Sequence, residues 1–247
     1  MKALIPAAGL GTRWYPWSRI VPKELLPLSN HPVLYYILEE AVSAGISEIG
    51  IIISESKELI KRYVEDIWRS DHPAISVQLI YQPSPRGIAD ALICSCEWVK
   101  HEPVAVLYPD EIHPPRGGIN KLKEAYESAP GTWIGLTETK QERSQSILEI
   151  QKNSDSSFMV TGYARGAQTL NIGFGTGRYI LNSGSISRNR DLLQAEKTDA
   201  REMDDDKIFE PLWQQGVCGI VLPEPIYDVG TPLNWQHCIK KWGIKRL

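Results

Sequence analysis

The sequence contains few cysteines, and they do not form a metal-binding pattern. The 247 residues include four cysteines and five histidines. Cys94 and Cys96 lie two positions apart and Cys218 and Cys238 stand far from them, so the chain has no Cys-x-x-Cys pair. The histidines do not cluster either. We therefore expect reduced cysteines with a structural role.

The sequence also lacks long hydrophobic runs and an excess of positive charge. No apolar stretch approaches the length of a membrane span, and Met1-Lys2 leads directly into a strand-like segment rather than into a charged and then apolar leader. A net charge of −3 provides no basic face for nucleic acid. We expect a cytoplasmic protein that binds neither membrane nor nucleic acid, and in which any phosphate site is local.

The first half of the chain alternates between helical and strand patterns. Apolar residues from Val33 to Val42 repeat at helical spacing, Gly45 supplies a stop, and Ile49 to Ile53 is typical of a buried strand. Further helices are expected around residues 57–68 and 88–98, and further strands at 77–81 and 104–107. This βαβ alternation predicts a mostly parallel sheet with helices on both faces.

Beyond residue 130 the helical pattern weakens. Strand-like pieces near residues 133–137, 147–150 and 158–163 lack long helices between them, which favours an antiparallel extension over the sheet. Residues 171–181 should return to the main sheet. A helix at 207–215, a strand at 217–222 and a last helix at 232–242 complete the expected order, so one domain with a small lobe is the simplest interpretation.

A glycine-rich segment follows the first expected strand. Residues 3–13 run from apolar residues into Gly9 and Gly11, where backbone N–H groups can surround an anion, and Arg13 adds a permanent positive charge. The segment lacks the Lys-Ser or Lys-Thr of a P-loop, and Trp14 stands where a dinucleotide fingerprint needs its third glycine. We expect a polyphosphate ligand of another class.

A second segment makes the family recognisable. Gly9-Leu10-Gly11-Thr12-Arg13 followed by Pro22-Lys23-Glu24-Leu25-Leu26-Pro27-Leu28 resembles the sugar-nucleotide pyrophosphorylases, which are sugar-1-phosphate nucleotidyltransferases. Pro22-Lys23-Glu24 is similar to the uridylyl enzymes, whereas Gln82 to Pro85 with Gly87 is similar to the thymidylyl enzymes. The resemblance resumes at residues 107–110, 177–181 and 227–232.

This resemblance implies an architecture. It implies a Rossmann-like, mostly parallel mixed sheet with helices on both faces and a small antiparallel lobe, within one nucleotidyltransferase domain at 1–247. Residues 1–112 would form the nucleotide-binding half, and residues 113–247 would supply the acceptor site and a second metal ligand. Ligands of open parallel sheets lie beyond the carboxyl ends of the strands. The segments 9–13, 82–87, 109–110 and 228–230 each follow an expected strand, so they should converge on one crevice.

The resemblance also implies roles for the charged residues. In the reaction an oxygen of the sugar phosphate attacks the α-phosphorus of the triphosphate and expels pyrophosphate, so positive charge and positioning matter most. Arg13 should contact the β- and γ-phosphates, and Lys23 the α-phosphate or the incoming phosphate. Asp110 and Asp228 are expected to hold Mg²⁺, a hard cation that prefers a few carboxylates together with phosphate oxygens.

The nucleotide base is expected at the segment after residue 81. The amide of Gln82 can donate and accept at once, which suits the imide edge of uracil or thymine, and Gly87 offers backbone close to the base. Ala8, Gly9, Gly11 and Thr12 would complete the nucleotide site with Arg13. Uracil and thymine differ by one methyl group, which a pocket discriminates by only about 1–3 kcal/mol, so both UTP and dTTP stay open.

The acceptor half departs from the family. Ser146 aligns with a glycine that lies against the sugar in relatives, and Arg165 aligns near the position of a lysine that holds the sugar phosphate. Arg165 either replaces that lysine or is a solvated loop residue. Asn171 either contacts sugar hydroxyls or acts as a cap or turn former.

Two classes of function follow. The first is a Mg²⁺-dependent enzyme that transfers UMP or dTMP from UTP or dTTP to a sugar 1-phosphate such as glucose 1-phosphate. The second is a non-catalytic regulatory or scaffolding homologue that binds nucleotide or sugar phosphate. Transfer to a non-sugar phosphate, such as a choline or polyol phosphate, also fits, and a homo-oligomer stays open.

Overall fold

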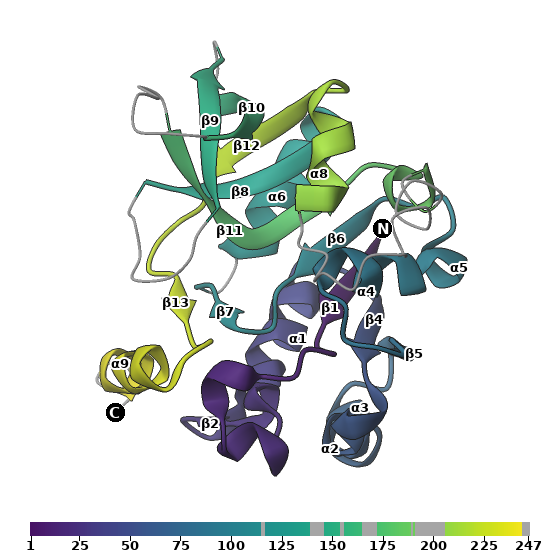
Figure 1. Cartoon of the computed structure of the whole chain (residues 1–247), viewed down its shortest axis with the longest axis vertical. Coiled ribbons are helices and arrows are strands. Elements are labelled where there is room, and N and C mark those ends of the chain that lie inside the picture. Colours follow the sequence, from purple (N-terminus) through teal and green to yellow (C-terminus); the bar gives the residue numbers. More distant parts are fainter. Residues whose placement is uncertain are drawn as a thin grey trace.

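A nine-stranded mixed sheet forms the frame of the molecule (Figure 1). The computed structural model describes residues 1–114, 117–138, 146–153, 156–164, 172–188, 190 and 206–243. In spatial order, the strands are β5 (Ser76–Tyr81), β4 (Glu48–Ile53), β1 (Lys2–Pro6), β6 (Val104–Leu107), β11 (Ile172–Leu181), β8 (Thr132–Thr137), β12 (Val217–Val221), β10 (Ser157–Tyr163) and β9 (Ile147–Lys152).

The main-sheet strands of the first half, β5, β4, β1 and β6, are all parallel. β1 lies between β4 and β6, with Leu4 opposite both Gly50 and Val106, and β5 extends the sheet beyond β4. Their carboxyl ends therefore lie at one edge, so the segments that follow β1, β5 and β6 leave the sheet on the same side, as expected.

The expectation of a mostly parallel sheet is wrong beyond β6. β11 is antiparallel to both β6 and β8, β8 and β12 are parallel, and β10 is antiparallel to β12 and β9. Connection length accounts for one of these pairs, since only a few residues separate β9 from β10 in the sequence and a parallel neighbour needs a crossover of a dozen or more residues. The other antiparallel pairs join strands that are far apart in the sequence, so their direction is set by the tertiary fold.

The expected antiparallel lobe is instead a small closed barrel continuous with the main sheet. β9 pairs with β10 and also with β11, where Gly173 lies opposite Leu148. The last five strands of the sheet thereby close on themselves, in the upper part of Figure 1. One pair in this barrel, β8 and β12, is parallel, so the lobe is not purely antiparallel.

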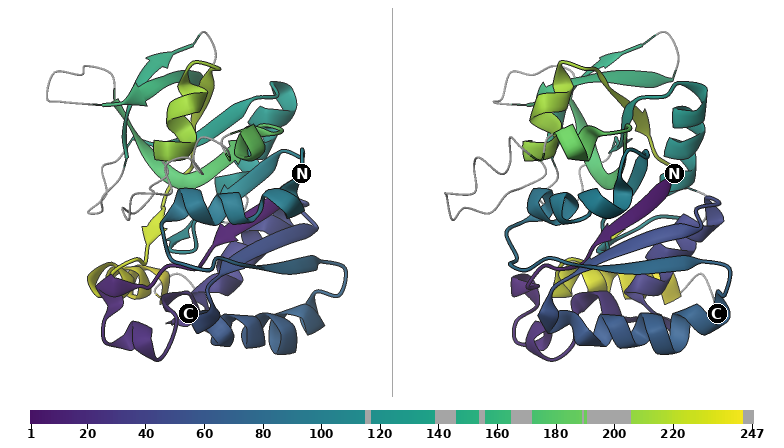
Figure 2. Two further views of the ribbon diagram at one scale, coloured as in Figure 1. Left: turned by 45° about the vertical axis from the view of Figure 1, so that its right-hand side comes forward. Right: turned by 90° about the vertical axis from the view of Figure 1, so that its right-hand side faces the viewer.

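Helices cover both faces of the sheet, as expected (Figure 2). Side chains of β1 alternate between two cores, since Ala3 and Ile5 belong to one and Leu4 to the other. The helices that pack in the first core are α1 (Val33–Ser43), α2 (Glu58–Arg62), the π-helical η5 (Tyr63–Trp68), α6 (Gly118–Ser128) and α9 (Pro232–Gly243). The helices that pack in the second are α4 (Ile88–Cys94), α5 (Cys96–Val99) and α8 (Asp206–Trp213).

The predicted helices differ from the observed ones in detail. The helix expected at 57–68 runs on through η5 into α3 (Arg69–Asp71), and the one expected at 88–98 is interrupted at Ser95, whose hydroxyl donates to the carbonyl of Leu92. Helix α6 was not predicted. Its buried positions are Gly118, Ile119 and Leu122, and Ala125 and Tyr126 pack partly buried against the same core, so the helical spacing is present but is divided among few apolar residues.

Short elements lie outside the main sheet. β7 (Glu111–Ile112) pairs antiparallel with β13 (Tyr227–Asp228), and β2 (Pro27–Leu28) pairs with β3 (His31–Pro32). The 3₁₀ turns η1 (Thr12–Trp14), η2 (Trp17–Arg19) and η3 (Lys23–Leu25) occupy the loop after β1, and η4 (Glu55–Lys57) follows β4. Trp14 packs edge-on against Trp235 of α9 at 5.8 Å, so this loop touches the last helix.

No disulfide joins Cys94, Cys96, Cys218 and Cys238, all of which lie in the described part of the chain. Among the described helices, none has the length and apolar character that a membrane crossing requires.

Candidate active site

The glycine-rich loop leaves β1 at the carboxyl edge of the sheet. The N–H of Ala7 still donates to Ile52 at 2.8 Å, and Ala8 is buried, whereas Gly9 and Thr12 are exposed. Gly11 has a φ of +65°, a left-handed conformation that favours glycine, and a Cβ there would lie 3.1 Å from Cβ of Ser18. The predicted nucleotide-binding residues of this loop therefore lie together, beside the start of η1.

Lys23 and Arg13 both face Asp110. Nζ of Lys23 lies 2.6 Å from Oδ2 of Asp110, and a guanidinium nitrogen of Arg13 lies 3.6 Å from the same oxygen. Burial by itself lowers the pKa of Lys23, but the charges of Asp110 and Glu24 outweigh it, so the net pKa is raised. Burial raises the pKa of Asp110, but Lys23 and Arg13 hold it below its usual value. Both groups are thus charged at neutral pH.

The pair β7–β13 brings the second aspartate to the same place. Asp228 lies opposite Glu111, and the N–H of Val229 donates to the carbonyl of Asp110 at 2.8 Å. Asp228 was expected to follow a strand of the main sheet. It instead lies within β13, outside that sheet, because the chain crosses from the barrel to pair with the short β7.

Gly230 marks the point where the charged side chains meet. A Cβ at this position would lie 3.0 Å from Oδ2 of Asp110, 3.0 Å from Oδ1 of Asp228 and 3.1 Å from Nη2 of Arg13. The carboxylate of Asp228 is held by the N–H of Gly230 at 2.6 Å and by the amide of Asn234 at 3.1 Å. The two carboxylates and the guanidinium therefore surround one small space.

This donor set fits Mg²⁺. Two hard carboxylate oxygens flank the space at Gly230, and Mg²⁺ commonly takes one or two carboxylates and completes its shell with water and phosphate oxygens. In the part of the chain that the structure describes, no group of three or more His, Cys, Asp and Glu side chains is placed to hold a metal.

A buried ion pair fixes η3, the short element that carries Lys23. Glu24, the next residue in η3, accepts a hydrogen bond from Lys57 of η4 at 2.9 Å, and the two side chains are 1% and 6% exposed. This contact joins η3 to the loop after β4. Truncating either side chain would leave the other as an uncompensated buried charge.

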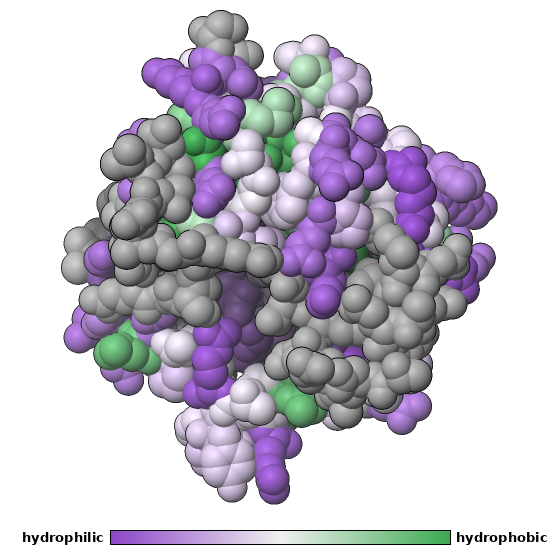
Figure 3. Space-filling view, turned by 45° about the horizontal axis from the view of Figure 1, so that its top comes forward, coloured by the Kyte–Doolittle hydropathy of each residue, from purple (hydrophilic) through white to green (hydrophobic). Residues whose placement is uncertain are grey.

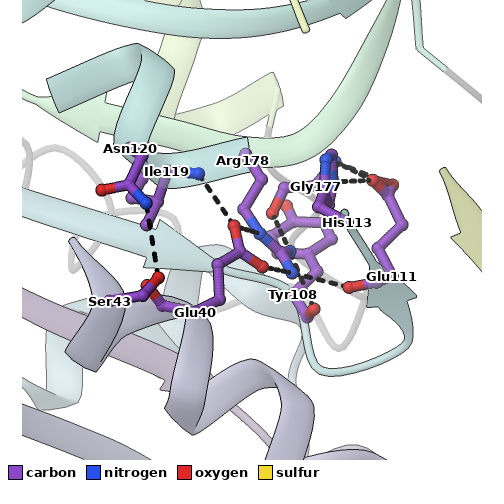
Figure 4. A network of polar contacts seen from close by, with 9 residues as sticks. All are labelled: Glu40, Ser43, Tyr108, Glu111, His113, Ile119, Asn120, Gly177 and Arg178. Atoms are coloured by element: carbon purple, nitrogen blue, oxygen red, sulfur yellow. Dashed lines mark hydrogen bonds and ion pairs between the residues drawn. The ribbon is translucent and has the colours of Figure 1, made fainter. Parts of the chain in front are cut away.

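A second buried network, shown in Figure 4, contacts the backbone on either side of Pro109 and Asp110. Arg178 of β11, fully buried, binds Glu40 of α1 through two hydrogen bonds of 2.9 and 2.7 Å. It also donates to the carbonyls of Tyr108 and Glu111, at 3.0 and 2.6 Å. Because these carbonyls bracket Pro109 and Asp110, the guanidinium holds the turn that carries Asp110.

Glu111 and His113 extend this network. The carboxylate of Glu111 accepts the N–H of Gly177 at 2.8 and 2.9 Å and lies 3.1 Å from Nε2 of His113. Burial and the charge of Arg178 lower the pKa of His113 to about 3, so the ring is neutral and donates through Nε2. The N–H of Ile119, at the start of α6, donates to Glu40, which joins α6 to the network.

Gln82 and Gly87 lie next to each other after β5. The side chain of Gln82 is buried, and its Nε2 donates to the carbonyl of Gly87 at 3.2 Å and to Asp90 at 2.8 Å. Gly87 has a φ of +93° and precedes α4. The amide nitrogen, which was expected to be available to the base, is thus already occupied by protein acceptors.

Of the residues predicted to contact the acceptor in the second half of the chain, the structure describes Ser146. Ser146 precedes β9, and its carbonyl accepts the N–H of Gly175 at 2.8 Å, which places it at the β9–β11 seam of the barrel. Arg165 and Asn171 lie outside the described residues. Figure 3 shows a recessed hydrophilic area near the centre of one face, with only small separate groups of apolar residues around it.

A glycine-rich loop, the cations Arg13 and Lys23 and two carboxylates thus lie together at the carboxyl edge of the parallel half-sheet. A family model described as nucleotidyl transferase matches residues 2–233. The chain belongs to this nucleotidyl transferase family, and the resemblance stated from the sequence is confirmed.

Relatives with known names are similar over different lengths. A putative UTP–glucose-1-phosphate uridylyltransferase of Bacillus subtilis (strain 168) is 33% identical over 96% of this chain and 95% of that protein. A UTP–glucose-1-phosphate uridylyltransferase of the same organism is 34% identical, and the match covers 57% of this chain and 55% of the relative, so the chain spans about half of its length.

Solved structures share the fold. An apo UDP-glucose pyrophosphorylase superimposes with a TM-score of 0.86 at 20% identity, covering 100% of this chain and 99% of that one. A UTP-bound UGPase from Acinetobacter baumannii gives 0.83 at 24% identity, covering 99% and 94%. At this identity the likeness shows the mixed α/β fold alone.

Sequence reasoning missed several residues that support the site. The partners Glu24 and Lys57 lie 33 positions apart, and Glu40 and Arg178 lie 138 apart, so no local pattern links them. Arg178 does stand in the segment 177–181 that carries part of the resemblance, and Glu24 stands in Pro-Lys-Glu. Nothing in the sequence singled out Asp90.

Proposed function

We propose that this protein transfers UMP from UTP to glucose 1-phosphate, forming UDP-glucose and releasing pyrophosphate. The observation that carries the proposal is that the side chains of Arg13, Asp110 and Asp228 meet around Gly230. Lys23 forms an ion pair with Asp110 at the same place. The relatives named as UTP–glucose-1-phosphate uridylyltransferases support UTP and glucose 1-phosphate as the substrates. A cytoplasmic location and a single domain at 1–247 belong to the same proposal.

In the proposed reaction, a phosphate oxygen of the sugar 1-phosphate attacks the α-phosphorus of UTP in line. A bond forms between that oxygen and the α-phosphorus, and the bond from the α-phosphorus to the oxygen bridging to the β-phosphorus breaks, so pyrophosphate leaves. No group of the protein needs to exchange a proton in this step. Its main task is to hold two anions together.

Arg13 and Lys23 have the charge and position for this task. The side chain of Arg13 is 53% exposed beside the glycine-rich loop, where its planar guanidinium can contact two oxygens of the β- and γ-phosphates. Lys23 is mostly buried and remains protonated, which suits a point charge against the α-phosphate or the acceptor phosphate. Ala8, Gly9, Gly11 and Thr12 would line the same phosphates.

Asp110 and Asp228 would hold Mg²⁺ beside these phosphates. Bound there, Mg²⁺ would neutralise charge that develops on the phosphate oxygens. The protein's own part is to fix the two carboxylates, through Arg178 beneath the turn of Asp110 and through Asn234 beside Asp228.

The base and acceptor sites complete the proposal. Gln82 and Gly87 would face a pyrimidine, because they follow β5, two strands away from β1 at the same edge of the sheet. Ser146 at the barrel would face the sugar, and Arg165 and Asn171 would contact the sugar phosphate and the sugar hydroxyls. dTTP is the alternative nucleotide, since a putative glucose-1-phosphate thymidylyltransferase of Bacillus anthracis also shares the fold.

A pyrophosphate-release panel tests the proposal. UTP, dTTP, CTP, ATP and GTP are each combined with glucose 1-phosphate, other sugar 1-phosphates, phosphocholine and a polyol phosphate, with Mg²⁺ or with EDTA. We expect the highest rate with UTP, glucose 1-phosphate and Mg²⁺, and a loss of activity in EDTA. Binding of UTP by calorimetry without release from any acceptor would instead favour the regulatory or scaffolding function.

A further inference from the structure

The amide of Gln82 is held in one orientation by two neighbours. Nε2 of Gln82 lies 2.8 Å from Oδ2 of Asp90 and 3.2 Å from the carbonyl oxygen of Gly87. A carboxylate and a carbonyl are both acceptors without a proton to give. Only the NH₂ group of an amide satisfies both, so a flipped amide, with its oxygen against two acceptors, would be repelled.

The oxygen of this amide, Oε1, is the polar atom of Gln82 that the two neighbours leave for another partner. Among the described residues, no hydrogen bond is donated to Oε1 of Gln82, and this atom is not one of the fully buried polar atoms that lack a partner. Gln82 therefore presents an acceptor, and no donor, to any group that approaches it from the site.

Asp90 is itself fixed. Its side chain is almost fully buried in the first turn of α4, and its second oxygen, Oδ1, accepts a hydrogen bond from Arg86 at 2.8 Å. Each carboxylate oxygen thus has one partner, and the group cannot turn away from Gln82 without breaking the contact with Arg86. The chain Arg86–Asp90–Gln82 runs from the surface to the expected base site.

We infer that Asp90 is a positioning residue that orients the amide of Gln82 so that its oxygen accepts the imide N–H of uracil or thymine, and that it thereby excludes cytosine. The inference rests on the proposed function, which places a pyrimidine nucleotide at Gln82. Uracil and thymine carry a hydrogen on N3, whereas N3 of cytosine is an acceptor and would face the acceptor oxygen of Gln82. Such an opposed pair leaves two buried polar groups unsatisfied.

The contact with Asp90 explains how the site would distinguish uracil from cytosine, which Gln82 alone does not explain. A freely rotating glutamine amide serves either base, because it can present its NH₂ to cytosine N3 or its oxygen to uracil N3–H. Discrimination arises only if one orientation is disfavoured, and the carboxylate of Asp90, which makes the shorter of the two contacts, contributes to this together with the carbonyl of Gly87. The C5 methyl group of thymine is not involved, so UTP and dTTP are treated alike by this contact.

The test compares kcat/KM for UTP and CTP in the wild type and in Asp90→Asn, with glucose 1-phosphate and Mg²⁺. The amide of an asparagine can donate to Oε1 of Gln82, so a flipped Gln82 amide would then face one acceptor, the carbonyl of Gly87, instead of two. We expect the ratio of kcat/KM for UTP to that for CTP to fall at least tenfold, through the KM for the nucleotide and with little change in the KM for glucose 1-phosphate. Asp90→Ala should act in the same direction.

Glu97→Gln is the matched control. Glu97 lies in the neighbouring helix α5, and it loses the same charge in the variant, but its carboxylate is exposed and pairs with Arg190 at 2.9 Å. The UTP to CTP ratio should not change in this variant. An unchanged ratio in a folded Asp90→Asn would overturn the inference.

A ligand-side measurement keeps the inference testable if the Asp90 variants do not fold. In 3-methyl-UTP the hydrogen on N3 is replaced by a methyl group, and we expect the wild type to use it at least tenfold less well than UTP. Equal use of 3-methyl-UTP would also overturn the inference. If the wild type uses CTP, ATP or GTP but not UTP or dTTP, the proposed function itself fails, an outcome distinct from an unchanged ratio.

Discussion

Lys23 and Asp110 form a close ion pair of 2.6 Å at the carboxyl edge of the parallel half-sheet. The two residues stand 87 positions apart, one after β1 and the other after β6, and the adjacent strands bring them together. Each group keeps the other charged in spite of burial, since the pKa of Lys23 is raised and that of Asp110 lowered. The proposed metal ligand and the proposed phosphate ligand are thus in direct contact.

Asp110→Asn should abolish most of the transferase activity. A neutral amide is a poor Mg²⁺ ligand beside phosphates, so we expect kcat to fall by a factor on the order of 10² or more while the far-UV circular dichroism is preserved. Asp66→Asn, an exposed position in η5, is the control and should retain full activity. Near-normal Mg²⁺-dependent turnover in Asp110→Asn would contradict the metal assignment.

Lys23→Met should destabilise the fold in a pH-dependent way. The folded pKa of Asp110 is lowered, so the pair stabilises the protein above the unfolded value of about 4, and this contribution is lost as the pH falls through the folded pKa. We expect a loss of about 1–3 kcal/mol in the free energy of unfolding at pH 7, shrinking below about pH 4. Urea titrations from pH 3 to 8 measure it, with the surface variant Lys61→Met as control. A loss independent of pH would contradict the linkage.

Gly230→Ala should impair activity more than stability. The new Cβ would lie 3.0 Å from oxygens of Asp110 and Asp228 and 3.1 Å from Arg13, so these side chains must shift by a few tenths of an ångström. Displacements of this size at a reaction centre cost roughly tenfold to a hundredfold in kcat/KM. Gly131→Ala, where the nearest atom is 3.9 Å away, is the matched control. Equal activity of the two variants would show that the space at Gly230 is not used.

Arg178→Met should be strongly destabilising, and a second substitution should relieve part of the loss. The single variant leaves Glu40 buried without its cation, which commonly costs about 3–5 kcal/mol. Glu40→Met combined with Arg178→Met removes both charges, so the double variant should be more stable than Arg178→Met alone. Chemical denaturation of the wild type, both single variants and the double variant gives the coupling. Additive losses would show that the two residues act independently.

The sequence by itself determined the local structure and the family of this protein. Apolar spacing predicts α1, β4 and β6 close to their observed bounds, because helix and strand periods are properties of neighbouring residues. The segments 9–13 and 22–28 identify the family and indicate Arg13 and Lys23 as candidate site residues. This is possible because a loop that binds phosphate is built from contiguous residues. The roles given to Ser146, Arg165 and Asn171 stay predictions.

Tertiary structure alone decided how distant segments meet. The closure of the last five strands depends on the pairing of β9 with β11, and the position of Asp228 depends on β13 crossing to β7. No repeating sequence pattern predicts the contacts between side chains that support the site. These are the pairs Glu24–Lys57 and Glu40–Arg178 and the hydrogen bond between Asp90 and Gln82. Such a bond requires only that the fold bring two atoms within about 3 Å. The sequence contains these residues, but only the packing of the elements selects their partners.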